Sequence, residues 1–133
     1  MGSALKSGCV YFLLVFVVGF VLGTVRALFL APLFGEMVAV SIELPIILLA
    51  SWLICRALIE RFAVPATLTA RALMGATALA LLLSAEVLLS VLLLGRSVAQ
   101  HLELYQSAEG LTGLAGQIVF ALFPGIQLVM ASD

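Results

Sequence analysis

Four long apolar stretches dominate this sequence and constrain its fold more than any other feature. They run over about residues 8–31, 37–58, 69–94 and 111–130. At about 1.5 Å per residue, each is long enough as a helix to cross a hydrocarbon core of about 30 Å. Inside lipid the backbone must satisfy its own hydrogen bonds, and a helix does so within one segment. The stretches therefore predict an all-α, polytopic membrane protein, built as a four-helix bundle in a single domain of residues 1–133.

The composition excludes several other classes of protein. Only 10% of the 133 residues are charged and 65% are hydrophobic, whereas a soluble domain usually carries about 25% charged residues. The net charge of −1, without a basic run, excludes a nucleic-acid partner. One histidine and two cysteines are too few for the usual structural zinc site or for a disulfide framework. We expect no metal and no cofactor, although a bound lipid would suit such a chain.

The connections between the spans carry turn and helix-start signals. Pro32 and Gly35 predict a tight turn after the first span, because proline does not continue a helix easily and glycine permits unusual backbone angles. Thr67 is placed as a helix-start residue before the third span. The longest polar connection, residues 95–110, predicts a short interfacial helix from the helical spacing of Val98, Leu102 and Tyr105.

Positive charge in the connections predicts the orientation of the bundle. Cytoplasmic loops of membrane proteins are enriched in lysine and arginine. One side of the predicted bundle would hold Arg26 and Arg96, and the other would hold Lys6, Arg56, Arg61 and Arg71. We expect both termini to be cytoplasmic, in a bacterial inner membrane, with these four residues anchoring the chain at anionic headgroups. A docking patch for a cytoplasmic partner is the alternative role for them.

Aromatic and cysteine residues near the same face fit this orientation. Tyr11 and Trp52 lie near the predicted cytoplasmic ends of the first two spans, where aromatic rings commonly anchor at the headgroups. Cys9 and Cys55 lie near that face too, in the compartment that keeps thiols reduced. We expect these cysteines to act as small apolar packing residues, without a disulfide.

Each span also carries one polar residue at a similar depth. From the helix rise, the four residues lie roughly 9 to 14 Å from the outer ends of their spans; they are Arg26, Glu43, Glu86 and Gln117. Such residues are costly in lipid and usually face the interior of a bundle. The coincidence predicts an intramembrane polar cluster in the outer half of the protein.

Small residues on the same helix faces support that cluster. Glycine lets helices approach closely in membranes, and each polar residue shares its face with small residues. The glycines predicted to pack at helix interfaces are Gly19 and Gly23, which form a GxxxG pair, together with Gly75 and Gly113.

The cluster permits a structural and a functional interpretation. In the structural one, Arg26 bridges Glu43 and Glu86, while Gln117 satisfies the remaining groups and fixes helix register. In the functional one, two carboxylates against one guanidinium leave a surplus negative charge. Glu43 or Glu86 would then exchange a proton or bind a cation or protonated amine. Pro45 and Pro124 could each leave a backbone carbonyl free to line the same cavity.

Other chemistry-bearing residues are sparse. His101, in the outer connection, is expected to be solvated rather than to act as a ligand. The sequence has no CxxC, HExxH or GxSxG motif and no phosphate-binding glycine loop. This favours a role other than that of an enzyme.

The size and the four spans resemble those of the small multidrug resistance transporters. That family has its essential glutamate in the first helix, whereas the first span here carries Arg26. The resemblance is therefore one of size, and no residue role is carried over from it.

Three functions fit the sequence. The first is an accessory or structural subunit of a membrane assembly, packing with copies of itself or with other chains. The second is a small proton- or cation-coupled transporter or channel that acts as an oligomer. The third is a membrane enzyme that modifies a lipid or an isoprenoid.

Overall fold

The protein is a bundle of long helices. In this computed structural model, which describes residues 2–131, the described residues form no strand. Four helical runs are long and apolar enough to cross a membrane, which confirms the predicted all-α membrane bundle. In chain order the elements are α1 (Gly2–Val25), a π-helical segment (Arg26–Leu30), α2 (Ala31–Phe34), α3 (Glu36–Arg61), α4 (Leu68–Leu92), α5 (Val98–Glu103), a 3₁₀ turn (Leu104–Gln106) and α6 (Ala108–Ala131).

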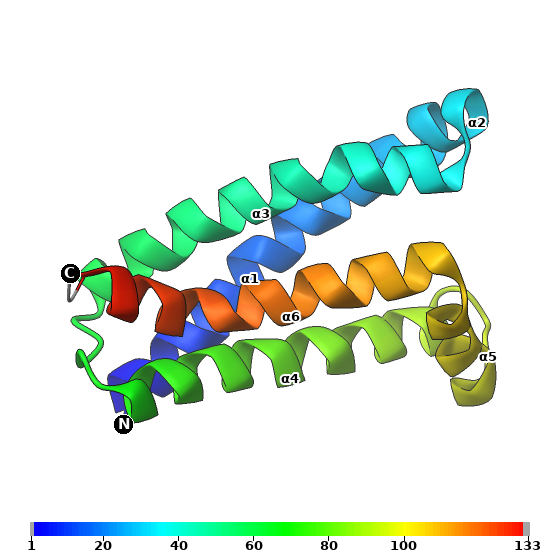
Figure 1. Ribbon diagram of the computed structural model, residues 1–133. Helices are drawn as coiled ribbons and strands as arrows, with labels where there is room; N and C mark the ends of the chain where they lie inside the picture. Colours follow the sequence, from blue (N-terminus) through cyan, green and yellow to red (C-terminus); the bar gives the residue numbers. More distant parts are fainter. Residues whose placement is uncertain (1, 132–133) are drawn as a thin grey trace.

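The four long helices form a ring. Helix α1 contacts α3 and α4, and α6 contacts the same two helices. Consecutive helices α3 and α4 therefore stand diagonally across the ring, joined by residues 62–67. This connection lies at the end of the bundle that also carries both chain termini (Figure 1).

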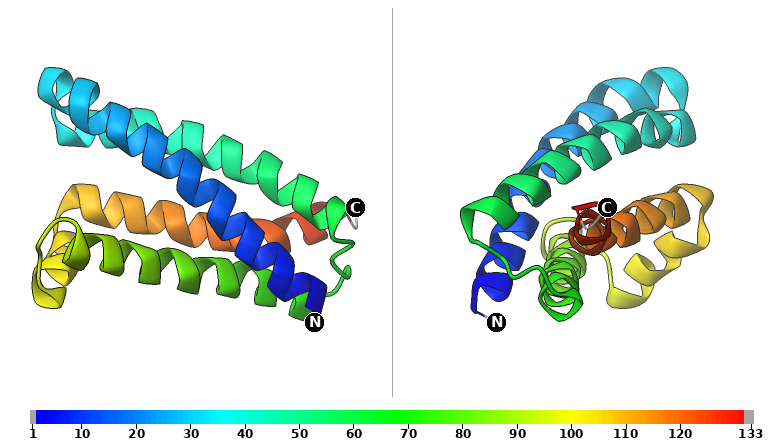
Figure 2. Two further views of the ribbon diagram at one scale, coloured as in Figure 1. Left: turned by 180° about the vertical axis from the view of Figure 1, so that it is seen from behind. Right: turned by 60° about the vertical axis from the view of Figure 1, so that its left-hand side comes forward.

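The two ends of the bundle differ in how the helices pack. We call the end with the termini the closed end and the end with α2 and α5 the open end. Toward the open end, α1 and α3 diverge from α4 and α6 (Figures 1 and 2), and we call these diverging pairs the first arm and the second arm. The apolar core belongs mainly to the closed half and contains Ala4, Tyr11, Val15, Cys55, Leu58, Val64, Ala70, Met74, Ala78, Leu82, Phe120 and Phe123.

Glycines allow two close helix crossings in the closed half. A Cβ atom on Gly75 would lie 2.0 Å from the carbonyl oxygen of Ala121, where α4 crosses α6. A Cβ atom on Gly8 would lie 2.8 Å from the carbonyl oxygen of Met74, where α1 crosses α4. Gly75 was predicted at a helix interface from the sequence, whereas Gly8 was not.

Three other glycines predicted at helix interfaces lie elsewhere. Gly19, Gly23 and Gly113 line the space between the arms, and a Cβ atom on any of them would meet no atom closer than 3.5 Å. Gly19 faces α3, since its Cβ would lie 3.6 Å from Ile47 Cδ1. Gly23 and Gly113 meet no other helix, contrary to their predicted place at helix interfaces. Gly116 allows the closer approach of α6 to α3, since its Cβ would lie 2.5 Å from Leu44 Cδ1.

The first helical run does not end at Pro32, contrary to the predicted turn. The chain continues through a π-helical segment, where the Ala31 N–H donates to the Arg26 carbonyl, and then into the single turn of α2. Proline is tolerated in the first turn of a helix, where its missing N–H is not needed. The break comes at Gly35, whose φ of 87° is accessible to glycine.

Pro124 explains the position of Tyr11. Because proline has no N–H, α6 leaves the Phe120 carbonyl without its usual helical donor. The Tyr11 hydroxyl donates to this carbonyl at 2.7 Å, and the two rings stack. Tyr11 is 0% exposed, so its predicted place at the headgroups was wrong. Trp52 lies edge-on against Phe123 and is only partly buried.

The short connections follow their sequence signals. Thr67 caps α4 by accepting a hydrogen bond from the Ala70 N–H. Ser97 and Gln100 form a reciprocal capping box at the start of α5. The predicted short helix in the third connection is thus confirmed.

Candidate functional site

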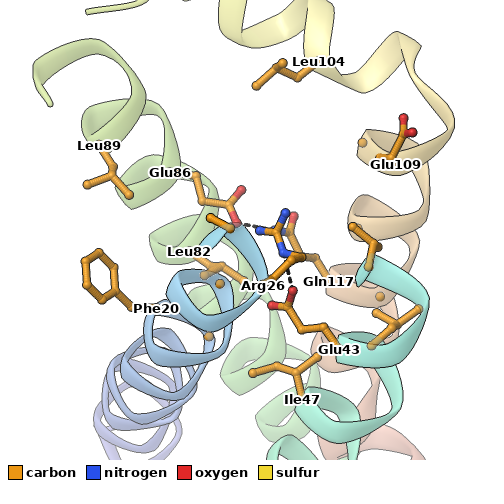
Figure 3. A pocket seen from close by; sticks show the side chains of 18 of the residues that line it. Phe20, Arg26, Glu43, Ile47, Leu82, Glu86, Leu89, Leu104, Glu109 and Gln117 are labelled. Carbon is orange, nitrogen blue, oxygen red and sulfur yellow. Dashed lines mark hydrogen bonds and ion pairs between the residues drawn. The ribbon is translucent and has the colours of Figure 1, made fainter. Parts of the chain in front are cut away.

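A cleft of about 980 Å³ lies between the two arms at the open end. It is lined from all four long helices and from the connection that contains α5. Its floor is formed by Val15, Leu82 and Phe120, which also belong to the core. Apolar side chains such as Phe20 and Leu89 form much of its wall, with polar groups gathered near its centre (Figure 3).

All four predicted polar residues line this cleft. They come from one long helical run each, and Figure 3 shows them projecting into the same part of the cleft. Their contacts nevertheless divide them into two pairs, one on each arm: Arg26 with Glu43, and Glu86 with Gln117.

The first pair belongs to the first arm. Arg26 begins the π-helical segment, and its Nε atom donates to a Glu43 carboxylate oxygen at 2.5 Å. Its Nη1 atom pairs with Glu36, the first residue of α3. The side chains of Arg26 and Glu43 are 28% and 17% exposed. One guanidinium therefore serves two carboxylates of α3, which leaves this group of three side chains with a surplus negative charge.

The second pair belongs to the second arm. The Gln117 Nε2 atom of α6 donates to a carboxylate oxygen of Glu86 on α4. Within the described chain, Glu86 has no ion pair with Arg26. The expected bridge from Arg26 to both glutamates was wrong, because the guanidinium pairs with Glu36 and Glu43, whereas Glu86 pairs with Gln117. The Gln117 Oε1 atom is buried without a hydrogen-bond partner among residues 2–131.

His101 is buried at the mouth of the cleft, so the expectation that it is solvated was wrong. It is 6% exposed and lines the cleft. Its Nε2 atom lies 3.3 Å from the Tyr105 hydroxyl. Burial first, and then the charge and hydrogen bond of Glu86, raise the pKa of Tyr105. Tyr105 therefore lies between His101 and Glu86 and keeps its proton at neutral pH.

Carboxylates outnumber cations around the cleft. The charged residues that line it are two arginines, Arg26 and Arg96, and four glutamates, Glu36, Glu43, Glu86 and Glu109. Arg96 contacts the Ser90 hydroxyl at 3.5 Å rather than a carboxylate. The surplus carried by the glutamates makes the cleft a better environment for a cation than for an anion.

Sequence reasoning missed three residues of this site. Glu36 directly follows the predicted turn at Gly35 and was not considered for the cluster, although it begins α3 and pairs with Arg26. Tyr105 had been used only as evidence for a helix. Glu109 follows the same polar connection and lines the cleft from α6. The many polar residues of the connection could have indicated Tyr105 and Glu109. They were not considered because the cluster was predicted only from residues inside the spans.

The predicted basic anchors separate into two kinds. Lys6, Arg56 and Arg61 are exposed at the closed end, where contact with headgroups stays a prediction. Arg71 is 6% exposed, and its guanidinium donates to the carbonyl oxygens of Pro65 and Pro124. Arg71 thus joins α4 to α6 and does not anchor the chain from the surface.

Pro45 does not contribute to the cleft. It is exposed on α3, and neither it nor Ser41, whose carbonyl it would leave free, lines the cleft. Pro124 lies in the closed half, where Tyr11 satisfies the carbonyl that it leaves free. Cys55 is a buried core residue and Cys9 is exposed.

The described residues contain no group of three or more histidine, cysteine, aspartate or glutamate side chains placed to hold a metal ion. The donors that converge in the cleft suit hydrogen bonding and charge pairing instead. Comparisons of the chain with models of protein families, with curated proteins and with solved structures find no match.

Proposed function

We propose that this small integral membrane protein binds a cation in its cleft, and that the preferred ligand is a protonated amine with an apolar body. The second arm carries the proposal. Glu86 is a carboxylate within a membrane-spanning helix that receives a hydrogen bond from Gln117 but has no cationic partner within residues 2–131. A charge in such a place is costly unless a proton or a counter-ion joins it.

The neutral groups near Glu86 favour the same ligand. The Oε1 atom of Gln117 is a buried acceptor without a partner among the described residues. An ammonium group has donors to share between this oxygen and the Glu86 carboxylate. Arg26 does not compete for Glu86, because its guanidinium is engaged by Glu36 and Glu43.

The dimensions and walls of the cleft support an organic ligand over a bare ion. Small-molecule sites usually enclose about 300 to 1,000 Å³ and are largely apolar with a few placed polar groups. The cleft has about 980 Å³, and its walls include Phe20, Ile47 and Leu89. An amine with an aromatic or branched apolar group would contact the apolar walls with its body and the polar groups with its ammonium.

A carboxylate that takes either a proton or a cation links the two binding events. At low pH a proton on Glu86 would compete with the amine, and release of one would favour uptake of the other. This exchange is the chemistry of a proton-coupled carrier. With the closed end at the cytoplasm, as the exposed Lys6, Arg56 and Arg61 support, the cleft would open outward.

The test uses two probes that share an apolar body, tryptamine, which is protonated at neutral pH, and its neutral alcohol analogue, tryptophol. Glu86→Gln should weaken tryptamine binding to the detergent-solubilised protein by about tenfold or more, since a hydrogen bond to a charged group contributes roughly 1.5 to 3 kcal/mol. Tryptophol binding should be unchanged. Glu103→Gln, an exposed carboxylate on α5, serves as the control.

Unchanged tryptamine binding in Glu86→Gln would overturn the proposal. Native mass spectrometry of protein solubilised in mild detergent provides a second measurement, because it records bound amine, bound lipid and associated chains together. A stoichiometric partner chain that displaces tryptamine would instead support the subunit role predicted from the sequence.

A further inference from the structure

His101 is the one buried residue of the short helix α5. Its apolar residues Val98 and Leu102 are 54% and 56% exposed, whereas His101 is 6% exposed. The capping box of Ser97 and Gln100 fixes the start of the helix and hence the direction in which His101 points. The fold therefore buries His101 against the cleft, while the other five residues of this helix, polar and apolar alike, are exposed.

A continuous set of polar contacts runs inward from His101. Its Nε2 atom lies 3.3 Å from the Tyr105 hydroxyl, and the two rings meet edge to face with centroids 5.5 Å apart. After burial, the charge of the nearby Glu86 carboxylate is the next cause that raises the pKa of Tyr105, and both side chains line the cleft. Glu86 in turn accepts from Gln117. The contacts thus lead from the connection at the open end to the intramembrane carboxylate.

The outer end of this chain of contacts is a buried, unpartnered nitrogen. The Nδ1 atom of His101 has no hydrogen-bond partner within the described part of the protein. If Tyr105 donates to Glu86, its oxygen accepts from the Nε2–H of His101. Nδ1 of the neutral imidazole is then a free lone pair. A packing role alone does not require this arrangement, because an apolar ring would fill the same space without a polar atom to satisfy.

We propose that His101 and Tyr105 form a proton relay that delivers protons from the open end to Glu86. A proton binds at Nδ1 of His101, the Nε2 proton passes to the Tyr105 oxygen, and the Tyr105 hydroxyl proton passes to the Glu86 carboxylate. One proton enters and one arrives, Tyr105 stays neutral, and His101 is left as the other neutral tautomer. The relay rests on the proposed function, in which Glu86 exchanges a proton for a cation.

The surroundings of His101 suit transient positive charge. Histidine ordinarily changes charge between about pH 5 and 8, which fits it for proton transfer near neutrality. The titratable and charged groups that face the relay from α4, the following connection, the 3₁₀ turn and α6 are Glu86, Arg96, Tyr105 and Glu109, whereas Glu103 of α5 is exposed and does not line the cleft. Two carboxylates against one guanidinium favour the passage of a positive charge along these groups.

The experiment follows the arrival of the proton by time-resolved infrared spectroscopy after a downward pH jump. The carboxyl band of protonated Glu86 is identified by its loss in Glu86→Gln. In Tyr105→Phe and in His101→Ala the band should reach its normal final amplitude, but roughly 100-fold more slowly, at the low end of the usual contribution of a positioned proton-transfer group. Glu103→Gln, on the exposed side of α5, should behave as the unsubstituted protein.

Chemical rescue separates a relay from a packing role. Imidazole added to His101→Ala should restore the rate, while it should leave Tyr105→Phe slow. The relay is overturned if both variants keep the normal rate, if imidazole does not restore His101→Ala, or if Glu86 shows no protonation. Tryptamine affinity at a fixed, neutral pH should be unchanged in Tyr105→Phe. Failure of the relay is thus distinguishable from failure of cation binding, which is tested by Glu86→Gln and tryptamine.

Discussion

The closed and open ends of this bundle are built from the same four helices but differ in the residues between those helices. At the closed end, Gly75 brings α4 against α6, and Tyr11 and Phe120 stack in the middle of the ring. At the open end, Arg26 and Glu86 lie on separate arms beside a cleft. Lipid provides little hydrophobic drive for helix association. Close packing at the closed end therefore uses small residues and specific hydrogen bonds, including the one from the buried Arg71 to α6. At the open end Arg26, Glu43 and Glu86 line the space between the arms instead.

The largest effect is expected at the crossing of α4 and α6. Gly75→Ala would place its Cβ atom 2.0 Å from the Ala121 carbonyl oxygen, so the two helices must move apart. We expect the free energy of unfolding to fall by about 3 kcal/mol, measured by denaturant titration in detergent. Gly113→Ala is the matched control at the open end, where a Cβ meets nothing within 4 Å. It should be neutral or stabilising by up to about 1 kcal/mol.

A smaller effect is expected from the hydrogen bond between Tyr11 and the Phe120 carbonyl. Tyr11→Phe removes the side-chain donor to a buried carbonyl that Pro124 leaves without its helical N–H, and should cost about 1.5 kcal/mol of unfolding free energy. Pro124→Ala returns the helical N–H donor to this carbonyl. Tyr11→Phe should therefore cost less in the Pro124→Ala background, and equal costs in both would contradict the explanation.

At the open end, double-mutant cycles should separate the two arms. The coupling energy between Arg26→Gln and Glu43→Gln should be about 1 kcal/mol, within the range measured for polar pairs in membrane helices. The coupling between Arg26→Gln and Glu86→Gln should lie within about 0.4 kcal/mol of zero, as for residues without a shared contact. A larger second coupling would mean that the arms close and bring Glu86 to Arg26.

The smallest effect concerns the pH dependence of the second arm. The raised pKa of Tyr105 means that the folded state holds its phenolic proton more tightly than the unfolded state does. Its contribution to stability is complete below the usual tyrosine pKa of about 10 and is lost as the pH rises through the folded pKa. The difference between tyrosinate absorbance titrations of the unsubstituted protein and Tyr105→Phe should have its midpoint above pH 10. A midpoint at or below this value would contradict the burial of Tyr105 and, after that, its proximity to the Glu86 carboxylate.

Sequence alone predicts the spans well because the bilayer leaves the backbone few choices. Apolar length identified all four, and helix rise placed Arg26, Glu43, Glu86 and Gln117 at a common level, where they line one cleft. The pairing of these residues could not be predicted in the same way. It depends on how the long helices are placed relative to one another in three dimensions, which the helix rise does not give.

The predictions for Pro32 and His101 differ from the structure for reasons particular to each site. Pro32 was expected to end the first helix. Instead, the π-helical segment ends just before it, so that Pro32 lies in the first turn of α2, where its missing N–H is not needed for a helical hydrogen bond. His101 was expected to be solvated because its neighbours in sequence are polar. Its burial depends on the docking of α5 against α4, which no local pattern reveals.

The diagonal connection of residues 62–67 has a consequence for assembly. Between residues 2 and 131, the chain passes from the α1–α3 hairpin to the α4–α6 hairpin only once, through this segment. Each hairpin is covalently complete and can insert into the bilayer as a unit, after which the two associate laterally. The protein thus consists of two helical hairpins joined by one short connection. Residues 1–63 and 64–133, expressed as separate chains, should therefore associate and reconstitute the bundle.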